Sequence, residues 1–288
     1  MDDAHVFNQH RPLLFSIAYR MLGSAADADD MVQEAFLRWR EAAAGVAHPK
    51  AYLSTVVSRL CIDHLRSARV KREEYVGVWL PEPLLTTEDA GFTDAASLAD
   101  SLQVAFLVLL ESLSPTERAV FLLREVFDFT YAEVAEVVGR NEAACRQIVK
   151  RARDRIAEGR PRFSASREQK ERLTREFVRA CGSGDLDRLI RLLSKDVVLY
   201  SDGGGIAGTA RKPIYGAARV LRLIAALLRK APPSTELRMA DVNGQPAVIV
   251  TAGPWPAGVF WIEPMDGCVR TIYMVVNPAK LKAFLPRA

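Results

Sequence analysis

The 288-residue sequence has little of what metal centres, disulfide frameworks and histidine-based catalysis require. It contains only four cysteines, which lie far apart and form no CxxC pair: Cys61, Cys145, Cys181 and Cys268. This spacing argues against a zinc site and a disulfide framework, and it favours reduced, buried thiols. All four histidines precede residue 65, so the C-terminal half has none for acid–base chemistry. We expect no metal and no cofactor.

The sequence also lacks long apolar runs, and we expect no secretory leader. The N-terminus, MDDAHVFNQHRP, is acidic and has no apolar segment typical of a signal peptide. The longest apolar run, near Leu221–Leu228, is too short to span a bilayer. We therefore expect a cytoplasmic protein without a membrane segment, and the length allows two or three compact domains.

The net charge of +4 is too small for a chain that is polybasic throughout, but the charge is uneven. Residues 140–162 contain eight Lys or Arg and three Asp or Glu, whereas residues 71–110 contain two and seven. Segments of opposite charge predict different partners.

Residues 130–156 predict a helix-turn-helix. Tyr131–Val138 forms a first helix, Gly139 permits a tight turn, and Asn141 suits the N-cap of a second helix. The apolar positions expected to face inward are Val134, Ala135, Val138, Cys145, Ile148, Val149 and Ala152. A basic second helix suits the DNA major groove. An ordinary helical hairpin with a solvated basic face is the alternative.

Residues 6–72 predict an all-helical domain with helices at 6–22 and 25–43 and a third that begins at Pro49. The second helix has a buried stripe of Val32, Phe36 and Trp39 and an opposite face that carries Asp27, Asp30 and Glu34. That acidic face suits either a partner helix or the helix dipole. The third helix combines Tyr52 with basic residues, which suits a DNA strand or a solvated helix end.

Three ordered stretches, DADDMVQEAFLRWR, PKAYLSTVVSRLCIDHLRSAR and SPTERAVFLLREVFDFTYAEVAEVVG, resemble bacterial RNA polymerase sigma factors. The resemblance covers about residues 6–160 and is to the small extracytoplasmic-function type, which keeps regions 2 and 4. It implies a transcription initiation factor whose partners are the polymerase core and the −10 and −35 promoter elements. The implied core-binding residues are Asp30, Gln33, Glu34 and Trp39. The implied DNA-binding residues are Tyr52, Arg59, His64, Arg66 and Arg69 for the −10 element, and Arg140, Arg146, Gln147, Lys150 and Arg151 for the −35 element. Arg59 and Ile148 depart from many relatives, which leaves the promoter sequence open.

Residues 73–100 predict an acidic linker that contains the motif WLPEPLL. Its apolar side chains are unsuited to free exposure, so we expect the segment to dock with Trp79 as the anchor. Region 2 of the same chain and another domain remain equally open as the docking surface.

Residues after Pro161 predict an α+β domain. Two helices separated at residues 182–184 precede a strand at 196–201 and a helix at 216–229. Four antiparallel β segments and a short final helix follow, at Thr235–Val242, Ala247–Thr251, Gly258–Ile262, Cys268–Val276 and Pro278–Leu285. This order resembles the SnoaL-like, ketosteroid-isomerase-like cone over about residues 166–288. The predicted division is 1–72, 73–100, 101–162 and 163–288.

The motifs WLPEP, DGGG and NPAKL together resemble a sigma-factor subgroup that uses this appended domain as a built-in regulator. The implied interdomain regulatory residues are Trp79, Pro81, Glu82, Pro83, Asp202, Gly203, Gly204, Gly205, Asn277, Pro278, Lys280 and Leu281. Ile206 stands where the subgroup usually has Lys, and Ala279 where it usually has Asp. If relatives use a contact between that Lys and an acid, this chain has lost it or moved it.

An enzyme of this fold needs an acid or base in its cavity. The visible side chains of that kind are Asp196, Tyr200, Asp202 and Tyr273, and each has an ordinary structural role open to it. We expect no enzymatic activity, and ligand sensing without turnover is the favoured hypothesis. Nothing in the sequence requires more than a monomer.

Overall fold

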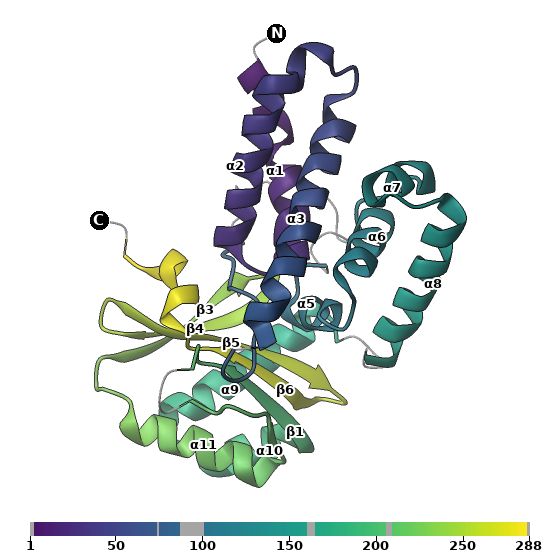
Figure 1. Cartoon of the computed structure of the whole chain (residues 1–288). Coiled ribbons are helices and arrows are strands. Elements are labelled where there is room, and N and C mark those ends of the chain that lie inside the picture. Colours follow the sequence, from purple (N-terminus) through teal and green to yellow (C-terminus); the bar gives the residue numbers. More distant parts are fainter. Residues whose placement is uncertain (1–2, 74, 87–100, 160–164, 206–208, 287–288) are drawn as a thin grey trace. The chain divides into compact units, whose positions relative to one another are not determined.

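The parts of the chain that the computed structural model describes are residues 3–73, 75–86, 101–159, 165–205 and 209–286, with the backbone alone at 68–73 and 159. The chain divides into two compact units (Figure 1). The helical unit comprises Met1–Glu74 and Glu88–Arg160, and the sheet unit comprises Tyr75–Thr87 and Pro161–Ala288. The predicted fold class is confirmed, because helical domains precede an α+β domain.

The first part of the helical unit is a three-helix bundle, visible in Figure 1, of α1 (Asp3–Leu22), α2 (Ala25–Ala42) and α3 (Pro49–Glu73), with the 3₁₀ turn η1 at Ala43–Gly45. Gly23, with a φ of 67°, ends α1 in the left-handed region. Ser24 then caps α2 by accepting a hydrogen bond from the Asp27 amide at 3.2 Å. Apolar side chains at helical spacing fill the bundle, among them Leu14, Ile17, Val32, Trp39, Leu53 and Val57.

The second part contains α5 (Val104–Leu110), α6 (Pro115–Glu125), α7 (Tyr131–Val138) and α8 (Glu142–Gly159). Capping boxes begin α6 at Ser114 and α7 at Thr130. Gly139 ends α7 with a φ of 65°, and the Asn141 side chain accepts from the Ala144 amide at 2.8 Å. The predicted helix-turn-helix is therefore present. The expected inward residues are buried except at the end of α7, where Val137 is buried and Val138 is only half-buried.

The sheet unit begins with α9 (Arg167–Ser183) and α10 (Leu186–Leu192), which lead into β1 (Leu193–Asp202). A two-residue strand that the sequence analysis missed, β2 (Ile214–Tyr215), pairs with β1. The remaining elements are α11 (Ala217–Lys230), β3 (Thr235–Val242), β4 (Gln245–Ala252), β5 (Trp255–Met265), β6 (Cys268–Val275), and the 3₁₀ turns η3 (Pro278–Lys280) and η4 (Lys282–Phe284). The expected final helix at Pro278–Leu285 is wrong, because each of these turns closes separately.

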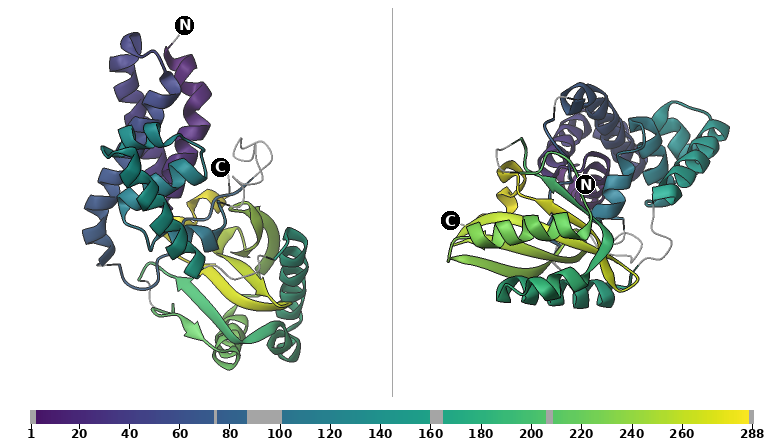
Figure 2. Two further views of the ribbon diagram at one scale, coloured as in Figure 1. Left: turned by 90° about the vertical axis from the view of Figure 1, so that its right-hand side faces the viewer. Right: turned by 90° about the horizontal axis from the view of Figure 1, so that it is seen from below.

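The strands form one sheet in the order β2-β1-β6-β5-β4-β3. The expected antiparallel run is confirmed for β3–β6, and β1, whose direction the sequence left open, lies parallel to β6. The antiparallel strands β3–β6 start at the edge of the sheet opposite β2 and proceed one strand at a time toward β1. Because each strand reverses direction relative to the one before it, this path sets the direction of β6 beside β1. Helices α9 and α11 pack on the sheet, and in the right-hand view of Figure 2 α11 lies across the strands. The core between helices and sheet includes Phe177, Leu199, Val248, Phe260 and Ile272.

Among the described residues, no helix combines the length and apolarity needed to cross a membrane. These residues also contain no group of three or more His, Cys, Asp or Glu side chains placed to hold a metal ion.

Candidate functional site

The segment of residues 75–86, called here the docked segment, packs on the sheet unit to which it belongs. Its C-terminal part runs beside the end of β3, where Leu85 forms an antiparallel bridge with Val242. The Asn243 amide donates to the Leu84 carbonyl at 2.8 Å, and the Leu84 amide donates to Asn243 Oδ1 at 3.1 Å. Backbone pairing thus fixes the register of this part of the segment.

The N-terminal part of the docked segment is held by Asp202, the last residue of β1. The Asp202 carboxylate is fully buried, with an exposure of 0%. Its Oδ1 accepts from the Tyr75 hydroxyl at 2.5 Å and from the Gly204 amide at 3.1 Å. Its Oδ2 accepts from the Leu80 amide at 2.8 Å and from Lys280 Nζ at 2.7 Å. We call Asp202, Lys280, Tyr75 and Leu80 the latch.

Lys280 completes the latch from the NPAKL turn. Its Nζ pairs with Asp202 and also donates to the Leu80 carbonyl at 2.5 Å. The same ammonium lies 4.3 Å from the centroid of the Trp79 ring and 5.5 Å from that of the Tyr75 ring. The side chain is 12% exposed, so these cation–π contacts act with little competition from water. In this chain the Lys–acid pair therefore joins the NPAKL and DGGG motifs directly.

Glycines allow the DGGG turn to approach its neighbours. A Cβ on Gly203 would lie 2.2 Å from Thr209 Oγ1, and one on Gly204 would lie 2.6 Å from Asn277 Cγ. Gly204 also has a φ of +61°, which side chains rarely adopt. The Asn277 side chain uses this space to donate to the Tyr75 hydroxyl at 3.2 Å.

The protonation of Tyr75 follows from its surroundings. Burial and the hydrogen bond to the Asp202 carboxylate raise the pKa of Tyr75 above its ordinary value. The hydroxyl thus keeps its proton at neutral pH and remains a donor to Asp202.

The structure gathers most of the predicted regulatory residues around this latch. Pro81, Glu82, Pro83 and Leu281 are buried, and Pro278 begins η3 after the Asn277 cap. A Cβ on Gly205 would lie 3.3 Å from Val76. Ile206 lies outside the described residues, and Ala279 is exposed. Sequence reasoning missed Tyr75, Leu80 and Asn243; of these only Tyr75, an aromatic just before Trp79, gave a usable signal.

The residues expected to bind the polymerase core lie on α2. Asp30 and Gln33 are exposed, and Glu34 pairs with Arg38 at 3.0 Å. Trp39 differs, because it is only 2% exposed and its indole donates to the Asp3 carbonyl at 2.8 Å. Trp39 therefore supports the α2 surface from the core instead of forming part of that surface.

Side chains expected to bind the −10 element make contacts within the helical unit. Tyr52 lies 6.1 Å from Trp39 between ring centroids. Arg59 of α3 donates to the Val137 and Glu136 carbonyls at the end of α7, at 3.0 and 2.7 Å. His64 lies 3.8 Å from Asp27, and Arg66 reaches Asp63 and Thr116, each at 3.4 Å. The Arg69 side chain lies outside the described residues.

The predicted −35 residues form an exposed polar face on and before α8. Arg140, Gln147, Lys150 and Arg151 are all exposed. Arg146 pairs with Glu142 at 2.6 Å and lies 4.9 Å from the Tyr131 ring centroid. Because Cys145, Ile148, Val149 and Ala152 anchor the opposite face, these polar side chains point away from the core.

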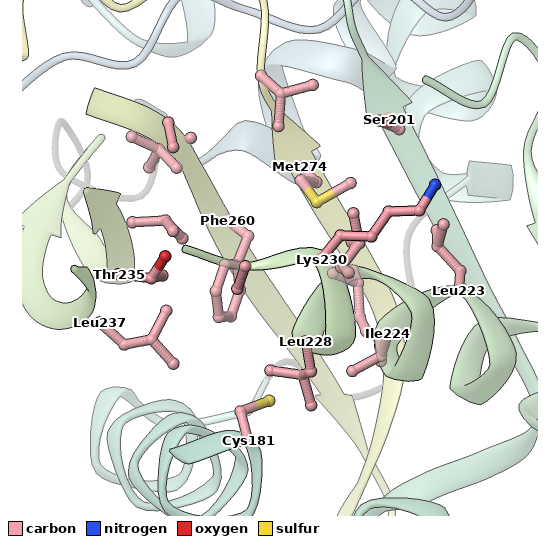
Figure 3. Close-up of a pocket in the computed structure, with 18 of the residues that line it drawn as sticks. Cys181, Ser201, Leu223, Ile224, Leu228, Lys230, Thr235, Leu237, Phe260 and Met274 are labelled. Atoms are coloured by element: carbon pink, nitrogen blue, oxygen red, sulfur yellow. The ribbon is translucent and has the colours of Figure 1, made fainter. Parts of the chain in front are cut away.

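A cavity of about 330 Å³ lies between the sheet and helices α9 and α11. Figure 3 shows its lining, which consists mostly of apolar side chains and also includes Ser201, Thr235 and Lys230. Tyr200 and Tyr273 stack on each other at 5.4 Å, and Asp196 pairs with Arg270. None of the four predicted acid–base candidates is among the residues that line the cavity.

Comparisons with known proteins agree with this arrangement. Residues 6–70 match the Sigma-70 region 2 family and residues 103–156 match Sigma-70, region 4. The chain is 38% identical over 285 residues to the ECF RNA polymerase sigma factor SigJ of Mycobacterium tuberculosis, covering 95% of this chain and 91% of the relative. It is 36% identical over 275 residues to the probable ECF RNA polymerase sigma factor SigI of that species, covering 94% and 92%. The crystal structure of Mycobacterium tuberculosis SigJ superposes with a TM-score of 0.77 at 34% identity, covering 97% and 98%.

Proposed function

Because the chain belongs to the extracytoplasmic-function RNA polymerase sigma factors, which direct transcription initiation, we propose that its C-terminal SnoaL-like domain inhibits this activity in cis by holding the docked segment. The observation that carries the proposal is the latch. Asp202 and Lys280 hold the backbone of Leu80 from both its amide and its carbonyl. This contact fixes part of the chain that connects the two promoter-binding regions.

The physical basis is the reach of the connecting chain. By their names the −10 and −35 elements are about 25 base pairs apart, roughly 85 Å at 3.4 Å per base pair. A sigma factor must separate its two DNA-binding regions to span them. Docking fixes residues 75–86, which could otherwise extend to about 40 Å at about 3.5 Å per residue, in one path from Asp202 at the end of β1 to Val242 at the end of β3. The latched form is therefore poorly suited to promoter binding.

Contacts inside the helical unit support the same direction of regulation. Arg59, expected to meet the −10 element, instead donates to two carbonyls at the end of α7. Arg118 of α6 is buried and donates to the Met21 carbonyl of α1 at 2.7 Å. These bonds join regions 2 and 4, so promoter binding requires them to break. When residues 75–86 are docked, less of the connecting chain is free to extend, and this favours formation of the same bonds again.

We assign the surfaces by their chemistry. The exposed part of α2, with Asp30, Gln33 and Glu34, docks on the polymerase core, and the exposed face of α8 meets the −35 element through phosphates and base edges. The sheet unit senses a small ligand without converting it, because the described residues that line its cavity are mostly apolar and Lys230, the charged one among them, is exposed. The protein acts in the cytoplasm and is a monomer when free of polymerase.

Transcription in vitro tests the regulatory proposal. Polymerase core and a promoter selected from a fragment library would be combined with the wild-type chain or with Asp202→Asn. We expect more transcript from D202N because the latch opens. Asp196→Asn is the matched control, since this exposed acid of the same strand pairs with Arg270 and is not part of the latch. A D202N protein that releases the docked segment but transcribes no better than wild type would refute cis inhibition.

A separate assay tests the assigned surfaces. Lys150→Ala should weaken promoter binding while leaving capture of the polymerase core unchanged, because α8 is assigned to DNA alone. Asp30→Lys should weaken capture of the core instead. Failure of the wild-type chain to capture core would contradict the assigned polymerase partner, whatever the state of the latch.

A further inference from the structure

The cavity of the sheet unit has the dimensions and lining of a site for an apolar molecule. Its volume, about 330 Å³, lies within the range of ligand pockets. An engineered apolar cavity of about 150 Å³ holds benzene, so this one suits a molecule of roughly two fused rings. Lys230 is the one charged side chain among the lining residues, and it is exposed. The interior therefore favours a ligand with an uncharged, apolar body.

Two hydroxyl groups give the cavity a specific polar requirement. Ser201 Oγ and Thr235 Oγ1 are buried and have no hydrogen-bond partner among the residues that the structure describes. Ser201 is 1% exposed, and both residues line the cavity. A buried hydroxyl without a partner destabilises the fold, so a ligand oxygen that bonds to it gains affinity. A hydroxyl or carbonyl oxygen on the ligand meets this requirement.

The opening of the cavity is marked by its exposed lining residues. Leu227 and Lys230 lie at the C-terminal end of α11, Ala231 and Pro232 follow them, and Ala257 lies near the start of β5. Ser201 lies near the end of β1, and Figure 3 shows it at the edge of the lining residues, above Met274 and Lys230. A ligand can thus enter beside α11 with its oxygen directed toward β1.

The cavity and the latch share the same two strands. Ser201 lines the cavity, while the next residue, Asp202, points to the other side of β1 and holds the docked segment. At the end of β6 the order is similar, because Met274 and the following Val276 line the cavity and the next residue, Asn277, bonds to Tyr75. The Val276 amide also donates to the Asp202 carbonyl at 2.8 Å. The residues that form this end of the cavity are therefore adjacent to those of the latch.

We propose that this cavity binds a mostly apolar molecule that bears a hydroxyl or carbonyl oxygen bonded to Ser201, and that binding stabilises the latch. A bond to Ser201 restrains the end of β1 and thereby holds Asp202 in the position that its four donors require. The second part of this inference rests on the proposed role of the latch. The first part, binding in the cavity, is independent of it.

The binding test uses 2-naphthol, a bicyclic apolar probe with one hydroxyl, and naphthalene, which lacks the hydroxyl. Titration of the full chain should give saturable one-to-one binding of 2-naphthol. Ser201→Ala should weaken it about fivefold to tenfold, the effect of one net hydrogen bond, and should leave naphthalene binding unchanged. Ser194→Ala is the matched control, because it deletes another buried hydroxyl of β1 that has no partner within the described ranges and does not line the cavity.

Two results would overturn the site. One is the absence of saturable 2-naphthol binding to the wild-type chain. The other is equal affinity in wild type and in Val250→Phe, a variant that fills the cavity from β4; thermal unfolding would establish that this variant folds. If V250F does not fold, S201A alone decides, because it removes a single atom without adding bulk.

Amide exchange tests the coupling to the latch. Saturation with 2-naphthol should slow exchange of the Leu80 amide by at least threefold in wild type and have no such effect in S201A. Binding that leaves Leu80 exchange unchanged would overturn the coupling. Neither the binding titration nor the Leu80 exchange measurement depends on transcription. Failure of the proposed ligand site or of its coupling to the latch can therefore be distinguished from failure of cis inhibition, which is measured with D202N and polymerase.

Discussion

Replacement of Asp202 by asparagine tests the latch with almost no change in shape. All four groups around the carboxylate are donors: the Tyr75 hydroxyl, the Gly204 amide, the Leu80 amide and Lys280 Nζ. An asparagine NH₂ group would face two of these donors in either orientation, so no rotation of the amide restores the network. The charge that balances Lys280 is removed at the same time.

The expected cost follows from the burial of this pair. Removal of one partner from a buried ion pair costs about 3–5 kcal/mol. Asparagine retains one accepting oxygen, so the lower end of that range, about 3 kcal/mol, applies here. The docked segment can leave the sheet while the remaining strands stay paired, and so the cost appears as release of this segment. A change of about 3 kcal/mol corresponds to a factor of roughly 100 in the opening equilibrium.

Hydrogen–deuterium exchange measures this opening directly, since the Leu80 amide bonds to Asp202 itself. In D202N we expect exchange at Leu80 to accelerate roughly 100-fold, with amides of β5 and β6 unchanged. Asp196→Asn, on the same strand, should leave Leu80 at its wild-type rate. Acceleration of less than threefold at Leu80, or equal acceleration throughout the sheet, would refute the reasoning that the acid holds this segment.

Three further predictions concern single contacts. Gly204→Ala should weaken binding of the docked segment to the sheet by about 1–3 kcal/mol, because the new Cβ would lie 2.6 Å from Asn277 and the backbone has a positive φ. Faster hydrogen exchange of the Leu80 amide would show this weakening, and an unchanged exchange rate would contradict the prediction. Arg59→Ala should lower the stability of the helical unit by about 0.5–1.5 kcal/mol through loss of its bonds to α7, as measured by urea unfolding, and an unchanged midpoint would count against that contact. The Thr130 side-chain and backbone hydrogen bonds lower the pKa of Glu133 below its ordinary value of 4.5. The stabilisation by Glu133 is thus complete above pH 4.5 and is lost as the pH falls through the lowered pKa. The urea midpoint of the wild-type chain should therefore decrease in that acid range, and this decrease should be smaller in Glu133→Gln. An equally steep decrease in the variant would exclude Glu133 as the source of the pH dependence.

Elements whose ends depend on local chemistry were predictable from the sequence. The helix-turn-helix follows from Thr130, Gly139 and Asn141, which act on groups within a few residues along the chain. Pairing across the sheet was less accessible. The parallel β1–β6 contact joins Val198 to Thr271, and no local pattern encodes a pairing over that separation.

The candidate site was predictable where a side chain carries the interaction and less so where the backbone does. Trp79, Asp202 and Lys280 stood out by motif, and they meet in the structure. Leu80 takes part through its amide and carbonyl, which its identity as leucine does not reveal. Trp39 shows a second limit of prediction from motifs. The motif implies that Trp39 belongs to a surface that binds a partner, whereas the side chain is buried and supports that surface from inside.

The chemistry of the latch suits a contact that must release. Desolvation of Asp202 and Lys280 offsets much of their mutual attraction, so a buried pair of this kind adds little net stability compared with apolar packing. An entirely apolar contact for the docked segment would be harder to open. The pair instead makes docking depend on geometry, because four donors must converge on one carboxylate. A small displacement of the end of β1 would remove several of these bonds together, and the proposed cis inhibition depends on this sensitivity, because release of the docked segment frees the chain that connects regions 2 and 4.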